Sequence, residues 1–146
     1  MFRGQFRHTI DTKGRVSIPA KFREAEAGIA GDKLVIVPNG VALEVHPFQK
    51  WEELEQRVNA LPRFDQDARE IRHRYLSLGQ DVSLDAHGRI QVPQDYRERV
   101  GLRKDVLVVG MQEYFEVWDV ERWEHAQRDP ARPMDELFKK LADKGV

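Results

Sequence analysis

The stretch IDTKGRVSIPAKFR, from Ile10 to Arg23, returns in altered form as LDAHGRIQVPQDYR, from Leu84 to Arg97. Both stretches read apolar–Asp–x–x–Gly–Arg–apolar–x–apolar–Pro, and both end in an aromatic residue followed by Arg. The two copies are offset by 74 positions in a chain of 146 residues. A repeated pattern of this kind predicts a fold that is built from two related halves.

The similarity extends beyond these stretches. The apolar run Leu34–Val37 is matched by Val106–Val109 at an offset of 72, and Trp51 is matched by Trp123 at the same offset. Each copy reads as a hairpin, a short helix, a strand, a turn, a second strand and a helix. We therefore expect an α+β fold that is mainly β, with two pseudo-symmetric halves and flanking helices.

The Asp-x-x-Gly segments have the composition of a tight turn. Asp at the first position of a type I turn accepts hydrogen bonds from the backbone two residues on, and Gly is favoured at the fourth position. Gly14 and Gly88 suit a left-handed backbone because they have no Cβ. We expect Asp11 and Asp85 to open the two turns of a three-residue hairpin loop with a bulge.

The segments after the turns predict strands and then helices. Apolar and polar residues alternate after Arg15 and after Arg89, as in a half-buried strand. Pro19 and Pro93 end these strands and suit the start of a helix. The other expected elements are buried strands at 34–38 and 106–110, partner strands at 41–45 and 114–118, and helices at 20–27, 94–100, 48–61 and 65–78. Gly28 and Gly101 are the expected ends of the two short helices.

Four parts are expected along the chain. Residues 1–60 form a first repeat with a trailing helix, residues 61–79 a linking helix, residues 80–129 a second repeat, and residues 130–146 a C-terminal tail helix. The tail helix is amphipathic, with apolar residues at Leu137, Phe138 and Leu141. Because its apolar face is small, we expect it to fray or to pack on a neighbouring subunit.

Composition limits the class of protein. The chain has no Cys, and its longest apolar runs fall short of the roughly 20 residues that cross a membrane. We therefore expect a soluble cytoplasmic protein with no membrane partner. The net charge is -1, but the first 24 residues carry six Lys or Arg against two carboxylates. A basic patch on a neutral chain indicates an anionic partner more sharply than the net charge does.

Catalysis and metal binding have little support in the sequence. No nucleophile elbow, phosphate-binding loop or dinucleotide-binding glycine motif is present. The five His residues show no i+3 or i+4 pairing, and no Cys could complete a zinc site. We expect neither an enzyme, nor a metal site, nor a cofactor.

Several of the selected residues also have a purely structural interpretation. The turn role of Asp11 and Asp85 is enough to explain both residues. Trp51 and Trp123 are more typical of core or interface anchors than of base-stacking platforms. The arginines after the turns are harder to explain by structure alone, because a strand can begin with almost any residue. Arg presents a rigid fork of donors that matches phosphate or guanine.

The doubled motif resembles the MraZ family of bacterial transcriptional regulators. MFRGQFRHTIDTKGRVSIPAKFR is similar to the family's N-terminal signature, and LDAHGRIQVPQDYRERVGLRKDVLVVG followed by FEVWD is similar to its second half. The resemblance covers the chain from Met1 to about Trp123. It implies a swapped-hairpin β-barrel of the AbrB-like (double-ψ) kind, assembled as a ring-like homo-oligomer. It also implies binding to the promoter of the division and cell-wall gene cluster, in the nucleoid.

The resemblance marks the Asp-x-x-x-Arg pairs as functional. They correspond here to Asp11 with Arg15 and to Asp85 with Arg89, while Gly88 shapes the second turn. We expect the first copy to contact double-stranded DNA at promoter direct repeats, through Arg3, Arg7, Lys13, Gly14, Arg15, Lys21 and Arg23. The alternative is a ring-forming interaction scaffold without sequence-specific DNA binding.

The two copies differ in charge. With the 74-residue offset, Arg3, Arg7, Lys13 and Lys21 fall on Ser77, Asp81, His87 and Asp95. Only the pairs Arg15/Arg89 and Arg23/Arg97 keep their charge. Because carboxylates repel phosphate, we expect the first hairpin to read the major groove and Arg89 mainly to brace the barrel or an interface.

Overall fold

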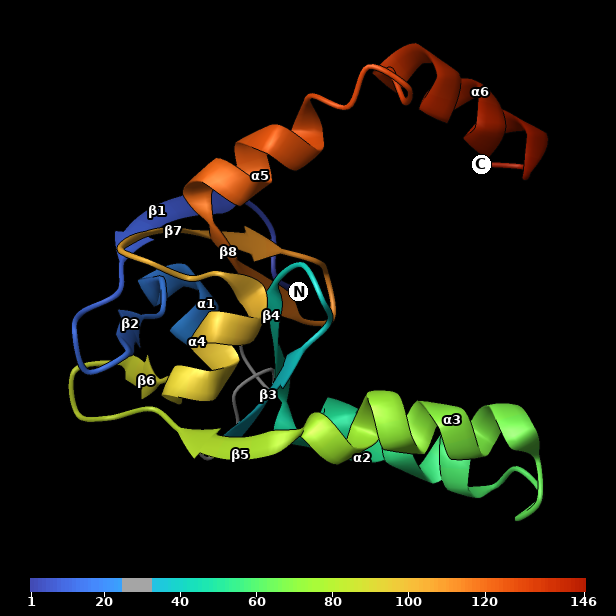
Figure 1. Cartoon of the computed structure of the whole chain (residues 1–146), viewed down its shortest axis with the longest axis horizontal. Coiled ribbons are helices and arrows are strands. Elements are labelled where there is room, and N and C mark those ends of the chain that lie inside the picture. The colour runs from blue at the N-terminus through green and yellow to red at the C-terminus, as the bar shows by residue number, and fades with distance from the viewer. Residues whose placement is uncertain (25–32) are drawn as a thin grey trace.

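The structure is a computed structural model that describes residues 1–24 and 33–146. Its strands are β1 Gln5–Thr9, β2 Arg15–Ser17, β3 Lys33–Pro38, β4 Leu43–Pro47, β5 Gln80–Ser83, β6 Arg89–Gln91, β7 Asp105–Gly110 and β8 Phe115–Asp119. Its helices are α1 Ala20–Arg23, α2 Phe48–Asn59, α3 Gln66–Arg74, α4 Gln94–Val100, α5 Val120–Gln127 and α6 Met134–Asp143, with a 3₁₀ turn, η2, at Leu76–Leu78. The α+β fold with mainly antiparallel strands is thus confirmed (Figure 1).

The strands of the two copies are interleaved. One antiparallel sheet has the order β1-β7-β8-β4-β3-β5, and β2 pairs with β6 in a separate two-stranded ribbon. Strand β1 of the first copy therefore borders β7 of the second, and β5 of the second copy borders β3 of the first. Neither copy could form this arrangement alone, which explains why the chain carries the pattern twice.

The register shows how the copies are related. In the ribbon, Val16 faces Ile90, its own counterpart at the 74-residue offset. In the large sheet, Glu44 faces Glu116, its own counterpart at the 72-residue offset. An antiparallel pair in which a residue faces its counterpart has local twofold symmetry. One pseudo-twofold relation therefore links the two copies through both pairs.

The main core lies between the ribbon and one face of the large sheet. Val16 and Ile18 of the first copy and Ile90 and Val92 of the second are all buried there. Phe22 of α1 packs in the same cluster, together with residues of α4 and of the four central strands. The predicted alternation after each turn is confirmed, because the apolar positions supply the core and the polar positions remain partly or fully exposed.

Helices α2 and α5 cover the opposite face. Trp51 of α2 is buried against Val35 and Val37 of β3. Trp123 of α5 packs against a second cluster that includes Trp118, with the two rings edge to face at 5.2 Å. The matched tryptophans are therefore anchors that fix equivalent helices to the sheet, as their spacing predicts.

The closed swapped-hairpin barrel that the family resemblance implies is not confirmed. The sheet is open, with β1 and β5 at its two edges. The ribbon adjoins the first edge through the isolated bridge Ile10↔Val16. Pro19 and Pro93 follow closely after β2 and β6, which have three residues each, so these strands are too short to pair along the edges of the large sheet.

Most predicted helices and strands are found close to their expected bounds. The helix predicted at 65–78 is shorter, because α3 ends at Arg74 and η2 follows after Tyr75 leaves the helical backbone conformation. Gly101 ends α4 with a left-handed φ of 67°, as expected. Of the helix predicted at 20–27, α1 covers Ala20–Arg23 with Glu24 as its C-cap, and residues 25–27, with Gly28, lie outside the described residues.

Two helical arms project from the sheet on the side away from the turns. The pair α2–α3 forms one arm and α5–α6 forms the other, and both extend to the right in Figure 1. The loops that hold Asp11–Gly14 and Asp85–Gly88 lie at the opposite, left edge of that view. Within the described residues, no helix is both long enough and apolar enough to cross a membrane.

Candidate nucleic-acid interface

The first turn is held together by the side chain of Asp11. Its Oδ1 accepts hydrogen bonds from the backbone N–H groups of Lys13, at 3.0 Å, and of Arg15, at 2.9 Å. The N–H of Gly14 donates to the carbonyl of Asp11 at 3.0 Å, and Gly14 has a φ of +83°. This is the turn that the Asp-x-x-Gly spacing predicts.

The second turn repeats this geometry. Asp85 Oδ1 accepts from the N–H groups of His87, at 2.8 Å, and of Arg89, at 2.9 Å, and Gly88 has a φ of +72°. The hydrogen bonds to the two Asp side chains, which shape both turns, are therefore local in sequence.

Each Asp also fixes the arginine that follows the turn. Arg15 Nε donates to Asp11 Oδ2 at 2.6 Å, and Arg89 Nε donates to Asp85 Oδ2 at 2.8 Å. The side chains of Arg15 and Arg89 are 35% and 28% exposed. Within the described residues, their terminal nitrogens have no hydrogen-bond partner. A fork held at Nε and open at its outer edge can donate two parallel bonds to a phosphate or to guanine.

These contacts lower the pKa of both carboxyl groups. The backbone N–H of Arg89 is the main cause for Asp85, and the Arg89 side chain and the N–H of His87 add to it, so its pKa falls to about 2. The pKa of Asp11 is lowered for the same reasons, with the N–H of Arg15 as the main cause. Both carboxylates therefore stay charged at neutral pH and keep the arginines in place.

Each turn is supported by the other copy. Val92 N–H donates to the carbonyl of Gly14 at 2.8 Å, and Gln91 Nε2 donates to the carbonyl of Lys13 at 3.0 Å. In the reverse direction, Ile18 N–H donates to the carbonyl of Gly88 at 3.0 Å. Pairing of β2 with β6 thus fixes both turns on one ribbon.

The other first-copy residues predicted to touch DNA are spread over the molecule. Lys13 is exposed near the tip of the first turn, Lys21 is exposed on α1, and Arg3 is exposed before β1. Gly14 is buried, which favours a role in shaping the turn. Arg23 Nε donates to the carbonyl of Ile18 at 3.1 Å, so this arginine helps to support the ribbon.

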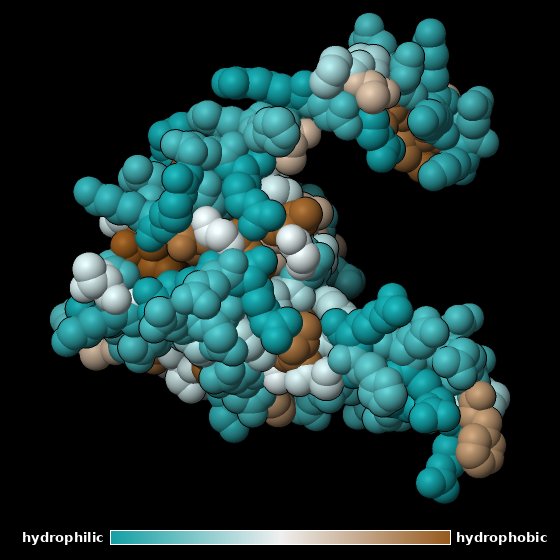
Figure 2. Space-filling model, viewed as in Figure 1, coloured by the Kyte–Doolittle hydropathy of each residue, from teal (hydrophilic) through white to brown (hydrophobic). Residues whose placement is uncertain are grey.

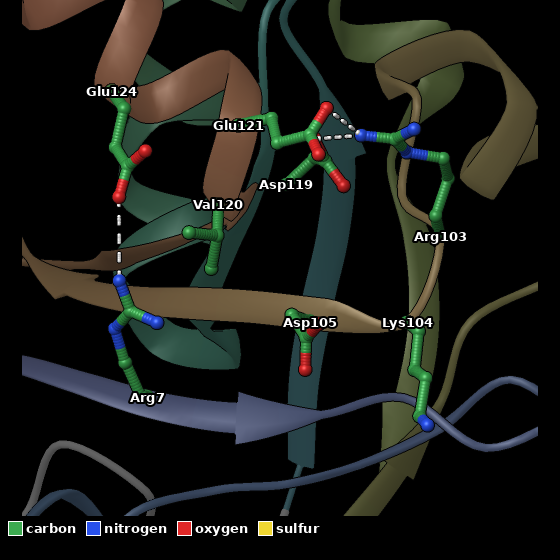
Figure 3. A pocket seen from close by; sticks show the side chains of 8 residues that line it. All are labelled: Arg7, Arg103, Lys104, Asp105, Asp119, Val120, Glu121 and Glu124. Carbon is green, nitrogen blue, oxygen red and sulfur yellow. Dashed lines mark hydrogen bonds and ion pairs between the residues drawn. The ribbon is translucent and has the colours of Figure 1, made fainter.

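Arg7 lies apart from the turns, beside α5. Its guanidinium pairs with Glu124 at 3.3 Å. Figure 3 shows both residues at a cavity of about 380 Å³. Four of the eight residues that line this cavity carry carboxylates, and Arg103 pairs there with Asp119 and with Glu121. Mixed charges of this kind do not favour phosphate. Arg7 is therefore engaged with α5, and we do not group it with Lys13 and Arg15 of the turn.

A buried polar cluster on the sheet is a feature that sequence reasoning missed. Glu44 and Glu116 are both buried, and Asn39 Nδ2 donates to both, at 2.9 and 3.1 Å. Burial acts to raise the pKa of Glu44, but hydrogen bonds from His46, Tyr75 and Asn39 outweigh it and lower the pKa. Glu44 and Glu116 occupy matched positions in the repeat, and this match was the signal in the sequence that could have pointed to the cluster. Buried carboxylates do not favour phosphate. Asn39 instead bridges Glu44 of β4 and Glu116 of β8, so the cluster links these two paired strands.

A second missed residue is Arg97 of α4. It lies against the first turn, and a Cβ added to Gly14 would be 3.0 Å from Arg97 Nε. The available signal was that Arg97 and Arg23 keep their charge at the 74-residue offset. The sequence does not show that each of these arginines lies against the turn of the other copy. Arg23 does the same at Gly88, where an added Cβ would be 2.7 Å from Arg23 Cδ.

Comparison with known proteins agrees with the doubled motif. The family model described as "MraZ protein, putative antitoxin-like" matches residues 1–74 and 77–143. Proteins named "Transcriptional regulator MraZ" from Moorella thermoacetica and Nitrosococcus oceani are 39% and 38% identical over 145 and 146 residues. These matches cover 98% and 97% of both chains. A protein of the same name from Natranaerobius thermophilus is 34% identical over 145 residues, again with 98% of both chains covered. The chain therefore belongs to the MraZ family.

Proposed function

We propose that this protein is a transcriptional regulator that binds double-stranded DNA sequence-specifically through its first turn. One observation carries the proposal. Asp11 holds Arg15 through Nε, so the outer edge of the guanidinium fork stays open beside the exposed Lys13. A fork that is already oriented loses little conformational freedom when it binds a base edge.

The turn and the ribbon would enter the major groove. A two-stranded β-ribbon fits that groove, where guanine presents two acceptors that match Arg. Arg15 would read a base, while Lys13, Lys21 and Arg3 would contact phosphates. Arg7 is omitted from this set because its partner is Glu124. Arg89 lies at the opposite end of the short ribbon and would brace the second turn.

The biological target that we propose is the one that the family resemblance implies. We propose that the protein acts in the cytoplasm, on the nucleoid, at the promoter of the division and cell-wall gene cluster, and that it performs no catalysis. The interleaved copies would correspond to the swapped hairpins of AbrB-like proteins, with the sheet left open. The regulator role of the curated relatives, which align over nearly the whole chain, supports this reading.

We further propose that copies of the chain associate with one another head to tail in a ring. Figure 2 shows apolar side chains on α6 and at the tip of the α2–α3 arm. Phe138 and Met134 of α6 are each 63% exposed, and Phe64 at the arm tip is 84% exposed. Arg63, Arg69 and Arg72 line a hollow on this arm beside Phe64, whereas the first turn of α6 carries Asp135 and Glu136. This charge complementarity favours α6 of one copy docking on the α2–α3 arm of the next.

A gel-shift experiment tests the proposed function. The full chain is titrated into a duplex taken from the region upstream of its own gene, with a scrambled duplex of equal length as competitor. We expect a shifted complex that survives an excess of scrambled DNA. If the chain assembles but the complex is lost to scrambled DNA as readily as to specific DNA, the scaffold alternative is correct.

A further inference from the structure

A cavity beside the first turn is lined by residues from both copies. Its volume is about 440 Å³. Lys13 reaches it from the first copy, and Arg97 reaches it from α4 of the second. Ser83, Gln91 and Gln94 add hydroxyl and amide groups. Two cations and several neutral donors therefore border one hollow, next to the arginine that we propose as the base-reading residue.

Among the residues that the structure describes, no carboxylate lines this cavity. The residues around it are neutral or basic, in contrast to the cavity at Arg7, where half of the lining residues are acidic. Asp81 and Asp95, whose charge makes the second copy look unsuited to phosphate, do not belong to this lining within the described residues. The lining itself thus carries two positive charges, even though the second copy as a whole is not basic.

Arg97 has an unused donor. Its Nε is buried, and within the described residues it has no hydrogen-bond partner. The matching atom of Arg23 donates to the carbonyl of Ile18 at 3.1 Å. A buried donor without a partner is costly, and in native proteins such groups call for an explanation. Arg97 thus differs from its symmetry mate Arg23, although each side chain lies against the turn glycine of the other copy.

We propose that Lys13 and Arg97 form a composite binding site for one phosphate of the DNA backbone. Arg97 would bind the phosphate with its planar fork, and Lys13 would neutralise it as a point charge. Pairing of β2 with β6 brings Lys13 of the first copy and Arg97 of the second to the same cavity, so neither copy contains the site alone. The inference rests on the proposed function, and it gives the second copy a direct part in DNA binding.

The salt dependence of binding measures this contact. Each phosphate that is neutralised by a cationic side chain steepens the dependence of log K on log salt by about one unit. We expect Arg97→Ala to lower the slope by about one unit and to weaken specific and scrambled DNA alike. Arg97→Lys keeps the charge and should keep the slope. Arg99→Ala is the matched control, because Arg99 is exposed on the same helix and does not line this cavity.

The variants also separate a phosphate contact from a packing role. If Arg97 only supports the first turn at Gly14, then Arg97→Ala lowers the midpoint of thermal unfolding but leaves the salt slope of the folded protein unchanged. That result would overturn the proposal. A slope that falls to the same extent in Arg99→Ala would overturn it as well, since the effect would then be a general loss of charge.

A second measurement does not need DNA. Inorganic phosphate is titrated into the ¹⁵N-labelled full chain, and the Nε–H resonances of Arg97 and Arg23 are followed by NMR. We expect a saturable shift for Arg97 that disappears in Lys13→Ala, with Arg23 unaffected. No saturable shift at Arg97 would refute the site. If the chain binds inorganic phosphate at Arg97 but does not bind specific DNA, the proposed function is wrong, although Lys13 and Arg97 still form a phosphate site.

Discussion

At the scale of single residues, the Asp–Arg pair is the part of the site that the sequence predicts best. Asp-x-x-Gly-Arg specifies a turn in which the hydrogen bonds to the Asp11 side chain are local, so no distant contact is needed to infer that Asp11 opens the turn. The position of Arg97 could not be predicted in this way. It depends on the pairing of β2 with β6, which places an arginine of one copy on the glycine of the other.

The two arginines that follow the turns provide a matched pair of variants. We expect Arg15→Ala to cost on the order of 1–3 kcal/mol of specific binding if Arg15 makes a bidentate base contact. Arg89→Ala removes the same bond to Asp but lies in the less basic copy, so it should affect stability more than base preference. Titrations with specific and scrambled duplexes measure both effects. Relaxed specificity in Arg89→Ala alone would reverse the assignment of the two copies.

The turn carboxylates predict a dependence of stability on pH. The folded-state pKa of Asp85, about 2, is below its ordinary value of 3.8. Its contacts therefore stabilise the fold above pH 3.8, and this stabilisation is lost as the pH falls from there toward 2. We expect thermal unfolding from pH 7 to pH 2 to show a smaller decrease in midpoint below pH 4 for Asp85→Asn than for the unsubstituted chain. Equal decreases would contradict this.

At the scale of elements, periodicity predicts the strands and helices but not how they close. The runs at 34–38 and 106–110 are apolar at every position because these strands are buried on both faces. That these segments are strands, and their order along the chain, could be predicted from the sequence. Closure into a barrel could not be predicted, because it depends on whether β2 and β6 pair along β1 and β5. Their short length, which the prolines limit, leaves the sheet open.

The close approach of the copies at the first turn can be measured with glycine substitutions. A Cβ at Gly14 would lie 2.4 Å from the carbonyl oxygen of Val92, and Gly14 has a φ of +83°. At Gly40, φ is +94° but an added Cβ meets nothing within 4 Å. Both Gly→Ala substitutions strain the backbone, which costs of order 1–3 kcal/mol. Only Gly14→Ala adds a clash with backbone.

We therefore expect Gly14→Ala to lower the free energy of unfolding more than Gly40→Ala. Gly88→Ala should fall between them, because the atoms it would meet belong to the Arg23 side chain, which can move. Urea denaturation of the three variants measures the order. If Gly40→Ala destabilises the chain as much as Gly14→Ala, the strain of the left-handed backbone is the whole effect and the contact with Val92 adds nothing.

At the scale of the whole molecule, net charge is a poor guide to the partner. The chain has a net charge of -1, yet its first 24 residues carry six Lys or Arg, and Arg63, Arg69 and Arg72 line one hollow on the α2–α3 arm, while α6 begins with two acidic residues. This distribution suits one surface that binds DNA and another that binds a neighbouring copy. The turns and the arms lie at opposite sides of the sheet, so both surfaces can be occupied together (Figure 1).

Assembly can be tested at the two exposed aromatic residues. We expect Phe138→Ser and Phe64→Ser each to reduce the oligomer to smaller species in light scattering, because each removes the largest apolar group from one side of the proposed contact. Met111→Ser is the control, since Met111 is 41% exposed but lies in the loop between β7 and β8, on neither arm. A monomer of the unsubstituted chain at micromolar concentration would count against a ring.

The arrangement of the operator follows from the arrangement of the subunits. Head-to-tail contacts are heterologous, so every subunit in a ring faces the same way along it. Successive first turns would then read DNA in one direction, and the operator should consist of direct repeats about 10 base pairs apart, all on one face of the duplex. Each weak contact gains from its tethered neighbours. Inserting about 5 base pairs between repeats rotates one of them to the far face by half a helical turn and should reduce affinity far more than inserting about 10. Footprinting and titration of both insertions measure this, and a single inverted repeat in the footprint would contradict head-to-tail assembly.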